Sequence, residues 1–353
     1  MINKKGVRVS GKDITTSIAT QRDRGNGLGG GFAAYGIYPE MKDFYAFHIM
    51  FDDKSCITAV EEYLRDVCYI EVQETIPTHR TAVIKKHPVF IRYFCSPHRN
   101  KFNFYQGPEY EGLTQNDYMV SVVMHINTHI SGAYVVSSGK NMGAFKGVGY
   151  PEEISEFFRL EDYKAYIWTA HNRFPTNTPG WWGGAHPFTL IDWSIVHNGE
   201  ISSYGINKRF IEMHGYQCTM QTDTEVVTYI LDYLIRKQGL SFKAACTVLA
   251  PPFWKDIERM PAEQKEVMTT LRAIYGAAVL NGPFAILLGH SNGLIGLSDR
   301  VKLRPLVCAT KDDFVYMSSE ESSIKAICPE PDDVWFPHAG EPVIVDLENG
   351  DKS

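Results

Sequence analysis

Three groups of polar residues, each close to an apolar segment, have types and spacing that suit chemistry on an amino acid. Arg173, in His171-Asn-Arg-Phe-Pro-Thr, offers a planar guanidinium that can bind a carboxylate through two hydrogen bonds. Asp223 stands at the start of a helical pattern, where the helix dipole keeps a carboxylate ionised and able to pair with an ammonium group. Asn198 and the backbone N–H of Gly199 are two neutral donors, which is what a developing oxyanion needs.

Together these groups describe a site for an α-amino acid whose side-chain carbonyl is attacked, and glutamine fits that description. Each group also has an ordinary structural explanation. Arg173 can form an ion pair, Asp223 can be a helix-cap charge, and Asn198-Gly199 can form a hairpin turn. Taken singly, the structural explanation is favoured for each of them, so the hypothesis of a site depends on the combination.

The elements around these residues are predicted to be two buried strands and one helix. Residues 165–170 and 193–196 are apolar runs that end at the Arg173 and Asn198 motifs. Thr222-Asp-Thr-Glu225 matches a capping box, with Thr222 as the N-cap and Glu225 reaching back to it. The helix after it presents one apolar face that consists of Val226, Val227, Ile230, Leu231 and Leu234.

Residues 44–165 alternate short strands with a helix, and we expect them to form an inserted α+β lobe. The expected strands are 45–51, 69–73, 89–94, 119–126 and 133–137, and the expected helix is 56–67. His125 and His129 would share one face of a strand, but no carboxylate or cysteine nearby completes a metal-ligand set. Ordinary histidines without a metal are therefore favoured there.

A glycine-rich stretch, Arg24-Gly-Asn-Gly-Leu-Gly-Gly-Gly-Phe32, comes after a predicted helix at about 12–24. Such a stretch can cradle a phosphate or allow close packing of backbone. It lacks the Lys-Ser/Thr of a phosphate-binding loop, and its helix precedes the glycines instead of coming after them. Close backbone packing is the favoured interpretation.

Composition and charge exclude several classes of protein. The formal net charge of -6, with 35 basic and 41 acidic residues, argues against a nucleic-acid partner. No apolar run approaches the roughly 20 residues that a membrane span requires. The seven cysteines are scattered without a CxxC pair and the start is not a secretory signal, so we expect a reduced, cytoplasmic protein.

The ordered motifs His171-Asn-Arg-Phe-Pro-Thr, His197-Asn-Gly-Glu and Thr222-Asp-Thr-Glu resemble those of class II glutamine amidotransferases. The likeness is greatest to the glutaminase domain or subunit of glutamate synthase. Supporting segments are Arg24-Gly-Asn-Gly-Leu-Gly-Gly-Gly, Asn177-Thr-Pro-Gly-Trp-Trp, Asp299-Arg-Val-Lys-Leu-Arg-Pro and Ser318-Ser-Glu-Glu. The resemblance implies one amidotransferase domain over 1–353 with 44–165 as the insertion, and an α+β fold, the four-layer αββα sandwich of N-terminal-nucleophile hydrolases.

By this resemblance, Arg173 binds the α-carboxylate of glutamine, Asp223 binds its α-amine, and Thr176 lines the pocket. Asn198 and Gly199 would form the oxyanion hole. The activity implied is hydrolysis of glutamine to glutamate and ammonia. A separate synthase subunit with FMN and iron–sulfur clusters would receive the ammonia, and this chain itself would bind no cofactor and no metal. Glutamate synthase is the favoured partner, which would place the protein in glutamate biosynthesis and nitrogen metabolism.

The start of the chain departs from the family's pattern. Family members begin with Cys-Gly and an apolar strand, and the cysteine attacks while its own α-amine serves as base. Met1-Ile-Asn-Lys-Lys-Gly6 resembles the segment after that strand, so the nucleophile is not among these residues. Two explanations stay open: a short Cys-Gly-leading extension precedes Met1, which we favour, or the protein is a catalytically inactive glutamine-binding or scaffolding subunit.

Overall fold

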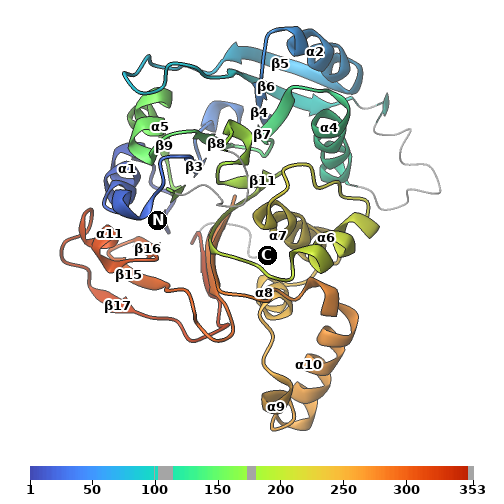
Figure 1. Ribbon diagram of the computed structural model, residues 1–353, viewed down its shortest axis with the longest axis vertical. Helices are drawn as coiled ribbons and strands as arrows, with labels where there is room; N and C mark the ends of the chain where they lie inside the picture. The colour runs from blue at the N-terminus through green and yellow to red at the C-terminus, as the bar shows by residue number, and fades with distance from the viewer. Residues whose placement is uncertain (99, 102–113, 173–179, 349–353) are drawn as a thin grey trace.

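The chain folds as a mixed α+β structure with two large antiparallel sheets and a smaller third sheet (Figure 1). The computed structural model describes residues 1–98, 100–101, 114–172 and 180–348. The helices in these ranges are α1 (Gly11–Ala19), α2 (Ser55–Val67), α4 (Gln115–His129), α5 (Pro151–Phe158), α6 (Tyr204–Met213), α7 (Asp223–Asp232), α8 (Phe242–Leu249), α9 (Trp254–Ile257), α10 (Ala262–Ile274) and α11 (Glu321–Lys325).

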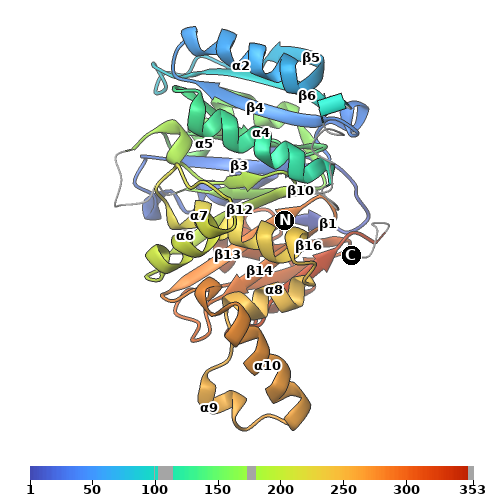
Figure 2. The same ribbon diagram turned by 90° about the vertical axis from the view of Figure 1, so that its right-hand side faces the viewer.

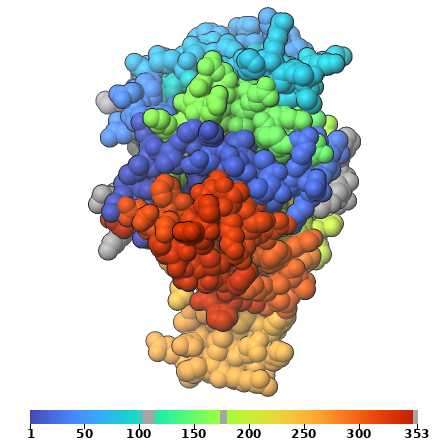
Figure 3. All heavy atoms as spheres, turned by 90° about the vertical axis from the view of Figure 1, so that its left-hand side faces the viewer, coloured from blue at the N-terminus to red at the C-terminus, as the bar shows by residue number. Residues whose placement is uncertain are grey.

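The first large sheet brings the start of the chain against its last third. Its seven strands, in spatial order, are β17 (Asp333–Trp335), β15 (Val307–Lys311), β16 (Phe314–Ser318), β1 (Ile2–Asn3), β10 (Ile167–His171), β3 (Gly30–Tyr35) and β8 (Met142–Gly147). Ile2 faces Val315 on one side and Ile167 on the other. Figure 3 shows the N-terminal segment in blue packed directly against the C-terminal segment in red. Residues 2–3 thus pair within the sheet, whereas the resemblance placed them after the first strand.

The second large sheet faces the first one. Its strands, in spatial order, are β11 (Phe188–Leu190), β12 (Trp193–Gly199), β13 (Phe284–His290), β14 (Gly293–Ser298) and β18 (Val343–Asp346). β10 contacts both β12 and β13, and a buried cluster that includes Ile2, Ile167 and Leu294 joins the two sheets. Helices α1, α5 and α11 contact the seven-stranded sheet, while α7 contacts β11 and β12 of the other.

The glycine-rich stretch packs against backbone, as the favoured interpretation expected. Gly31 lies in β3, opposite Lys146 of β8. A Cβ atom on Gly31 would lie 2.3 Å from the carbonyl oxygen of His186 and 2.6 Å from that of Phe145. Because neither carbonyl can move without disturbing its own segment, only glycine allows β3 to approach this closely.

A smaller four-stranded sheet forms a lobe at one end of the molecule (Figure 2). Its order is β5 (Cys68–Thr75), β6 (Val89–Pro97), β4 (Tyr45–Phe51) and β7 (Ala133–Ser137), and α2 and α4 pack on it. β8 and α5 fall within the expected 44–165 lobe, but both pack in or on the seven-stranded sheet. A short pair, β2 (Val9–Ser10) with β9 (Lys164–Ala165), lies beside that sheet.

The strand expected at 119–126 is wrong, because this segment lies within helix α4. Thr114 and Asp117 form a complete capping box at its start. The buried residues Met119, Val122, Val123 and Ile126 recur at helical spacing. His125 stacks on Tyr63 and His129, and no group of three potential metal ligands occurs in the described ranges.

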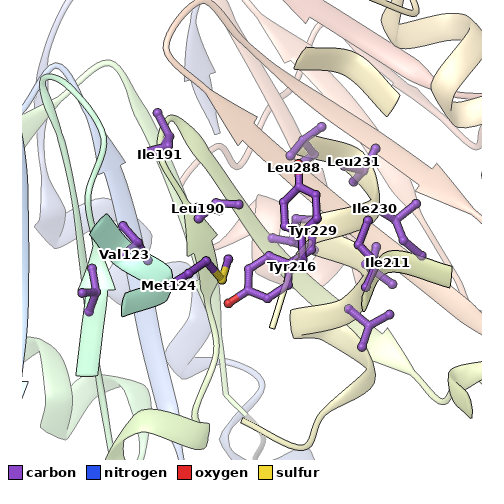
Figure 4. Packing of buried hydrophobic residues seen from close by; sticks show 14 of the residues in the cluster. Val123, Met124, Leu190, Ile191, Ile211, Tyr216, Tyr229, Ile230, Leu231 and Leu288 are labelled. Carbon is purple, nitrogen blue, oxygen red and sulfur yellow. The ribbon is translucent and has the colours of Figure 1, made fainter. Parts of the chain in front are cut away.

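The lobe shares its core with the layer that contains α7. Val123 and Met124 of α4 lie toward Leu190 of β11 and Tyr216 in Figure 4. At the start of α4, Asp117 forms ion pairs with Arg236 and Lys237, which come after α7. Apolar contact and buried charge therefore hold the lobe against the helix whose first residue is Asp223.

At the opposite end, α9 and α10 project away from the two sheets (Figures 1 and 2). None of the residues of α10 is buried, in keeping with this exposed position. Among the described residues, no helix combines the length and the apolar character that crossing a membrane requires.

Candidate active site

A cavity of about 1020 Å³ lies where the C-terminal end of β12 meets the first turn of α7. Asn198, Gly199 and Asp223 all line it, so two motifs that are separate in the sequence share one space. His171 and Asn172, at the end of β10, line it as well. The two other predicted residues, Arg173 and Thr176, lie outside the described residues.

The backbone of Gly199 is shaped as an oxyanion donor requires. The N–H of Glu200 donates to the carbonyl oxygen of Pro283, so Glu200 and Pro283 are a hydrogen-bonded residue pair in the antiparallel ladder. Antiparallel pairs alternate, so the N–H of Gly199, opposite Phe284, is directed away from β13. Gly199 has φ +144°, and a Cβ atom there would lie 2.0 Å from the oxygen of Pro283. A side chain at position 199 is therefore excluded.

Asp223 presents an ionised carboxylate at the cavity. Its Oδ2 accepts from the N–H of Ile201 at 3.0 Å, and its Oδ1 lies 3.6 Å from Nδ1 of His197. Burial acts to raise the pKa of Asp223, but His197, the Ile201 N–H and the Thr224 hydroxyl together lower it below its ordinary value. A carboxylate in this state can bind an ammonium group.

Two buried histidines, His186 and His197, contact Thr224, the residue that follows Asp223. Nε2 of His186 lies 2.9 Å from Oγ1 of Thr224, and Nδ1 of His197 lies 3.2 Å from the same oxygen. The ring of His171 lies 4.1 Å from that of His186, centroid to centroid. Burial above all, and then the neighbouring His171, His197 and Lys146, hold the pKa of His186 well below its usual range, so this imidazole is neutral.

The capping box expected at Thr222-Asp-Thr-Glu225 forms only in part. Thr222 is the N-cap, and its hydroxyl accepts from the N–H of Thr224. Glu225 instead accepts from the N–H groups of Thr219 and Met220, at 2.9 Å each. Glu225 is buried, and two free donors in the preceding loop satisfy its carboxylate without the N-cap N–H. It therefore fixes the loop before α7.

Part of the cavity wall is formed by the ends of two strands of the seven-stranded sheet, β10 and β16. Met1 and Trp168 exchange two backbone hydrogen bonds, of 2.8 and 3.0 Å, directly before β1 begins at Ile2. Beyond this point, residues 169–171 of β10 and 316–318 of β16 line the cavity without a described strand between them. Oγ1 of Thr169 is buried there with no hydrogen-bond partner among the described residues. Beside β1, the cavity therefore lies between the ends of β10 and β16.

A model of the family described as "Glutamine amidotransferases class-II" matches residues 114–350 of the chain, which is more than half of it. The chain belongs to the class II glutamine amidotransferases. The match extends over both cavity motifs and α7, which agrees with the resemblance of the sequence motifs.

Three relatives show how this member of the family is related to other proteins. It is 50% identical over 355 residues to an uncharacterised protein of Archaeoglobus fulgidus, a match that covers 100% of this chain and 92% of the relative. It is 24% identical to a putative glutamine amidotransferase of Methanothermobacter thermautotrophicus, with 90% and 88% covered. It is 27% identical to the glutamate synthase [NADPH] large chain of Bacillus subtilis, with 62% of this chain but 15% of the relative covered.

The buried α-amine of Met1 predicts a pH-dependent stability. Burial lowers the pKa of the Met1 amine from 8.0 to about 5, so between these values the unfolded chain holds a proton that the folded chain does not. The free energy of unfolding of a chain that begins at Met1 should therefore rise by roughly 4 kcal/mol from pH 5 to pH 8 because of this group. Denaturant unfolding at several pH values measures it.

An N-acetylated chain is the matched control, because it has every other titrating group in common with the unmodified one. Only the difference between the two stability profiles belongs to the α-amine. Equal slopes of stability against pH in the two proteins would contradict the burial of a neutral amine at this position.

Sequence reasoning missed the residues behind the cavity. His186 and Thr224 contact each other, but only Thr224 belongs to a motif, and its hydroxyl had no assigned role. Lys146 was also missed. Its Nζ donates to the Pro187 oxygen at 3.1 Å, and burial lowers its pKa to about 7. The one available signal was the presence of a histidine and a threonine inside the motifs that contain Asn198 and Asp223.

Proposed function

We propose that this chain is a glutaminase subunit that hydrolyses glutamine to glutamate and ammonia and supplies the ammonia to a partner synthase. One observation above all supports the proposal. Asn198, Gly199 and Asp223 line a single cavity, and the ends of β10 and β16 line it as well. An acid for the ammonium group and donors for an oxyanion thus adjoin a gap into which a nucleophile can be brought on a strand.

Each residue of the site has a distinct role in this reaction. Asp223 pairs with the α-ammonium group of glutamine, and Arg173 binds its α-carboxylate through two parallel hydrogen bonds. Thr176 lines the pocket beside Arg173. The side-chain amide of Asn198 and the N–H of Gly199 donate to the oxygen of the attacked carbonyl as it becomes negative.

The nucleophile is assigned to a cysteine that leads a segment preceding Met1. Its sulfur attacks the side-chain carbonyl of glutamine, its α-amine takes the thiol proton, and that proton leaves with the nitrogen as ammonia. Water then cleaves the γ-glutamyl thioester, which yields glutamate and restores the thiol. An α-amine is a suitable base because its ordinary pKa of about 7.7–8.0 lies close to neutral pH.

The same contacts support a fold assignment. Two sheets that face each other through β10 and β12, with helices on their outer faces, support the four-layer αββα sandwich of N-terminal-nucleophile hydrolases. In that arrangement a strand between β10 and β16 would carry the nucleophile at its start.

The partner that we propose is a separate glutamate synthase subunit with FMN and iron–sulfur clusters, and this chain would bind neither cofactor. The support is the likeness to a glutamate synthase large chain over 62% of this chain. The alternative is a catalytically inactive subunit that binds glutamine or serves as a scaffold.

An ammonia-release assay distinguishes the two functions. The chain would be compared with and without an added N-terminal segment that begins with Cys-Gly. Activity that appears only with the segment supports the glutaminase. Glutamine binding without turnover in both proteins supports the inactive subunit, and no binding by either would contradict both proposals.

A further inference from the structure

The hydroxyl of Thr224 is a junction between three segments of the site. Thr224 is fully buried in the first turn of α7. Its Oγ1 lies 2.9 Å from Nε2 of His186, 3.2 Å from Nδ1 of His197 and 3.2 Å from Oδ1 of Asp223. His186 precedes β11, and His197 lies in β12 next to Asn198. One oxygen thus joins the strand of the proposed oxyanion hole to the acid proposed for the ammonium group.

Counting protons at this junction determines which group donates. A threonine hydroxyl has one hydrogen and two lone pairs. The lowered pKa of Asp223 makes its carboxylate an acceptor only, so the single hydrogen of Thr224 goes to Oδ1 of Asp223. The two lone pairs then accept N–H groups from His186 Nε2 and His197 Nδ1. The geometry thus places a proton on Nε2 of His186 and on Nδ1 of His197.

The opposite ring nitrogens agree with this assignment. Nδ1 of His186 and Nε2 of His197 are buried, and within the described ranges neither has a hydrogen-bond partner. In native structures, buried N–H groups without a partner are rarer than acceptors with an unused lone pair. Both unpartnered nitrogens are therefore the deprotonated ones.

We propose that Thr224 is a positioning residue, whose hydroxyl fixes the tautomers of His186 and His197 and so holds Asp223 and Asn198 in the arrangement that binds glutamine. This inference rests on the proposed function, since it concerns the same site. This role of the Thr224 hydroxyl differs from that of most buried threonines in helices, whose hydroxyl donates to the carbonyl oxygen one turn earlier. Thr228, one turn along α7, does just that, donating to the carbonyl oxygen of Thr224 at 2.8 Å.

Thr228 supplies a matched control for the experiment. Thr228→Val removes a buried hydroxyl from the same helix without touching either histidine. Thr224→Val removes the junction while keeping the size of the side chain, and Thr224→Ser restores the hydroxyl. Thermal unfolding of all three variants first establishes that they fold.

Two measurements on the full chain then test the inference. Long-range ¹H–¹⁵N correlation spectra report the tautomer of each histidine ring, and calorimetry with L-glutamine reports the Kd. Thr224→Val should change the signals of His186 and His197 and raise the Kd at least about tenfold, because two buried N–H groups lose their acceptor. Thr224→Ser and Thr228→Val should keep both signals and stay within about twofold of the original Kd.

The outcomes separate this inference from the proposed function. If Thr224→Val leaves both tautomers unchanged, the junction is refuted whatever the chain binds. If the tautomers change while the Kd does not, the positioning role is refuted. If the unaltered chain binds no glutamine, the proposed function fails and the binding role of Thr224 fails with it, while the spectra still test the junction.

Discussion

A chain extended at its N-terminus should hydrolyse glutamine only when the added cysteine occupies the correct face of the extended strand. Ile2 packs between the two sheets, with Ile167 and Leu294, whereas Met1 packs on the other face with Ile14 and Ile18 of α1. Successive side chains of a strand alternate between faces. The first, third and fifth residues before Met1 would therefore face the five-stranded sheet that contains Asn198, and the second and fourth would face α1.

The register also shows how far the extension must reach. Ile2 faces Ile167, so the first added residue would face Thr169 and the third would face His171, at the end of β10. We therefore expect activity with a free N-terminal cysteine at the third or the fifth position before Met1. A cysteine at the fourth position should be at least about 100-fold less active, because small misplacements of a nucleophile have effects of that size.

Steady-state ammonia release from the three extended proteins measures this. Serine in place of cysteine, in the most active protein, controls for a contaminating glutaminase. Equal activity at the fourth position, or activity in the serine control, would contradict the placement of the nucleophile on a strand between β10 and β16.

In the active extended protein, Asn198→Ala should lower kcat by about 100- to 1,000-fold, which corresponds to roughly 2.7–4 kcal/mol of transition-state stabilisation. The side-chain amide of Asn198 would donate to an oxygen that becomes negative only during the reaction. For that reason, the KM for glutamine should change by less than about threefold. Steady-state kinetics over a range of glutamine concentrations separates the two parameters.

Asn281→Ala is the control for the Asn198 variant, since Asn281 is an exposed residue whose Oδ1 accepts from Arg300. It should leave both kcat and KM unchanged. If Asn198→Ala instead raised KM and left kcat as it was, Asn198 would bind the ground state of the substrate and would not be part of an oxyanion hole.

The motifs around the cavity could be predicted from sequence because each one combines an element boundary with a polar residue. Strand β12 ends at Gly199 and α7 starts at Asp223, close to the expected bounds. These ends meet in one cavity because of the order of the strands in the sheets. That order cannot be predicted from a single motif. The histidine junction could not be foreseen for the same reason: His186 belongs to no motif, and only the packing of its loop against α7 brings it to Thr224.

The errors have equally local causes. Residues 119–126 are rich in valine and isoleucine, which favour strands, yet the capping box at Thr114 and Asp117 starts a helix that buries every third or fourth residue. Glu225 has the spacing of a capping box, but its carboxylate accepts hydrogen bonds from the N–H groups of Thr219 and Met220, in the loop before α7, instead of from the N-cap. In both cases a hydrogen bond to residues a few positions away in the chain decided the outcome.

Titration of L-glutamine into the chain and into its Asp223→Asn variant, measured by calorimetry, tests the claim that this cavity binds the substrate. Asn keeps the size of Asp and an oxygen for the N–H of Ile201, but it removes the charge that would pair with the ammonium group. We expect binding at one site per chain and a Kd about 30-fold higher in the variant, a loss of roughly 2 kcal/mol. The control is Asp162→Asn, because Asp162 is an exposed carboxylate that pairs with Arg159. This variant should bind glutamine with the Kd of the unaltered chain. Equal glutamine affinity with and without the Asp223 charge would contradict the account.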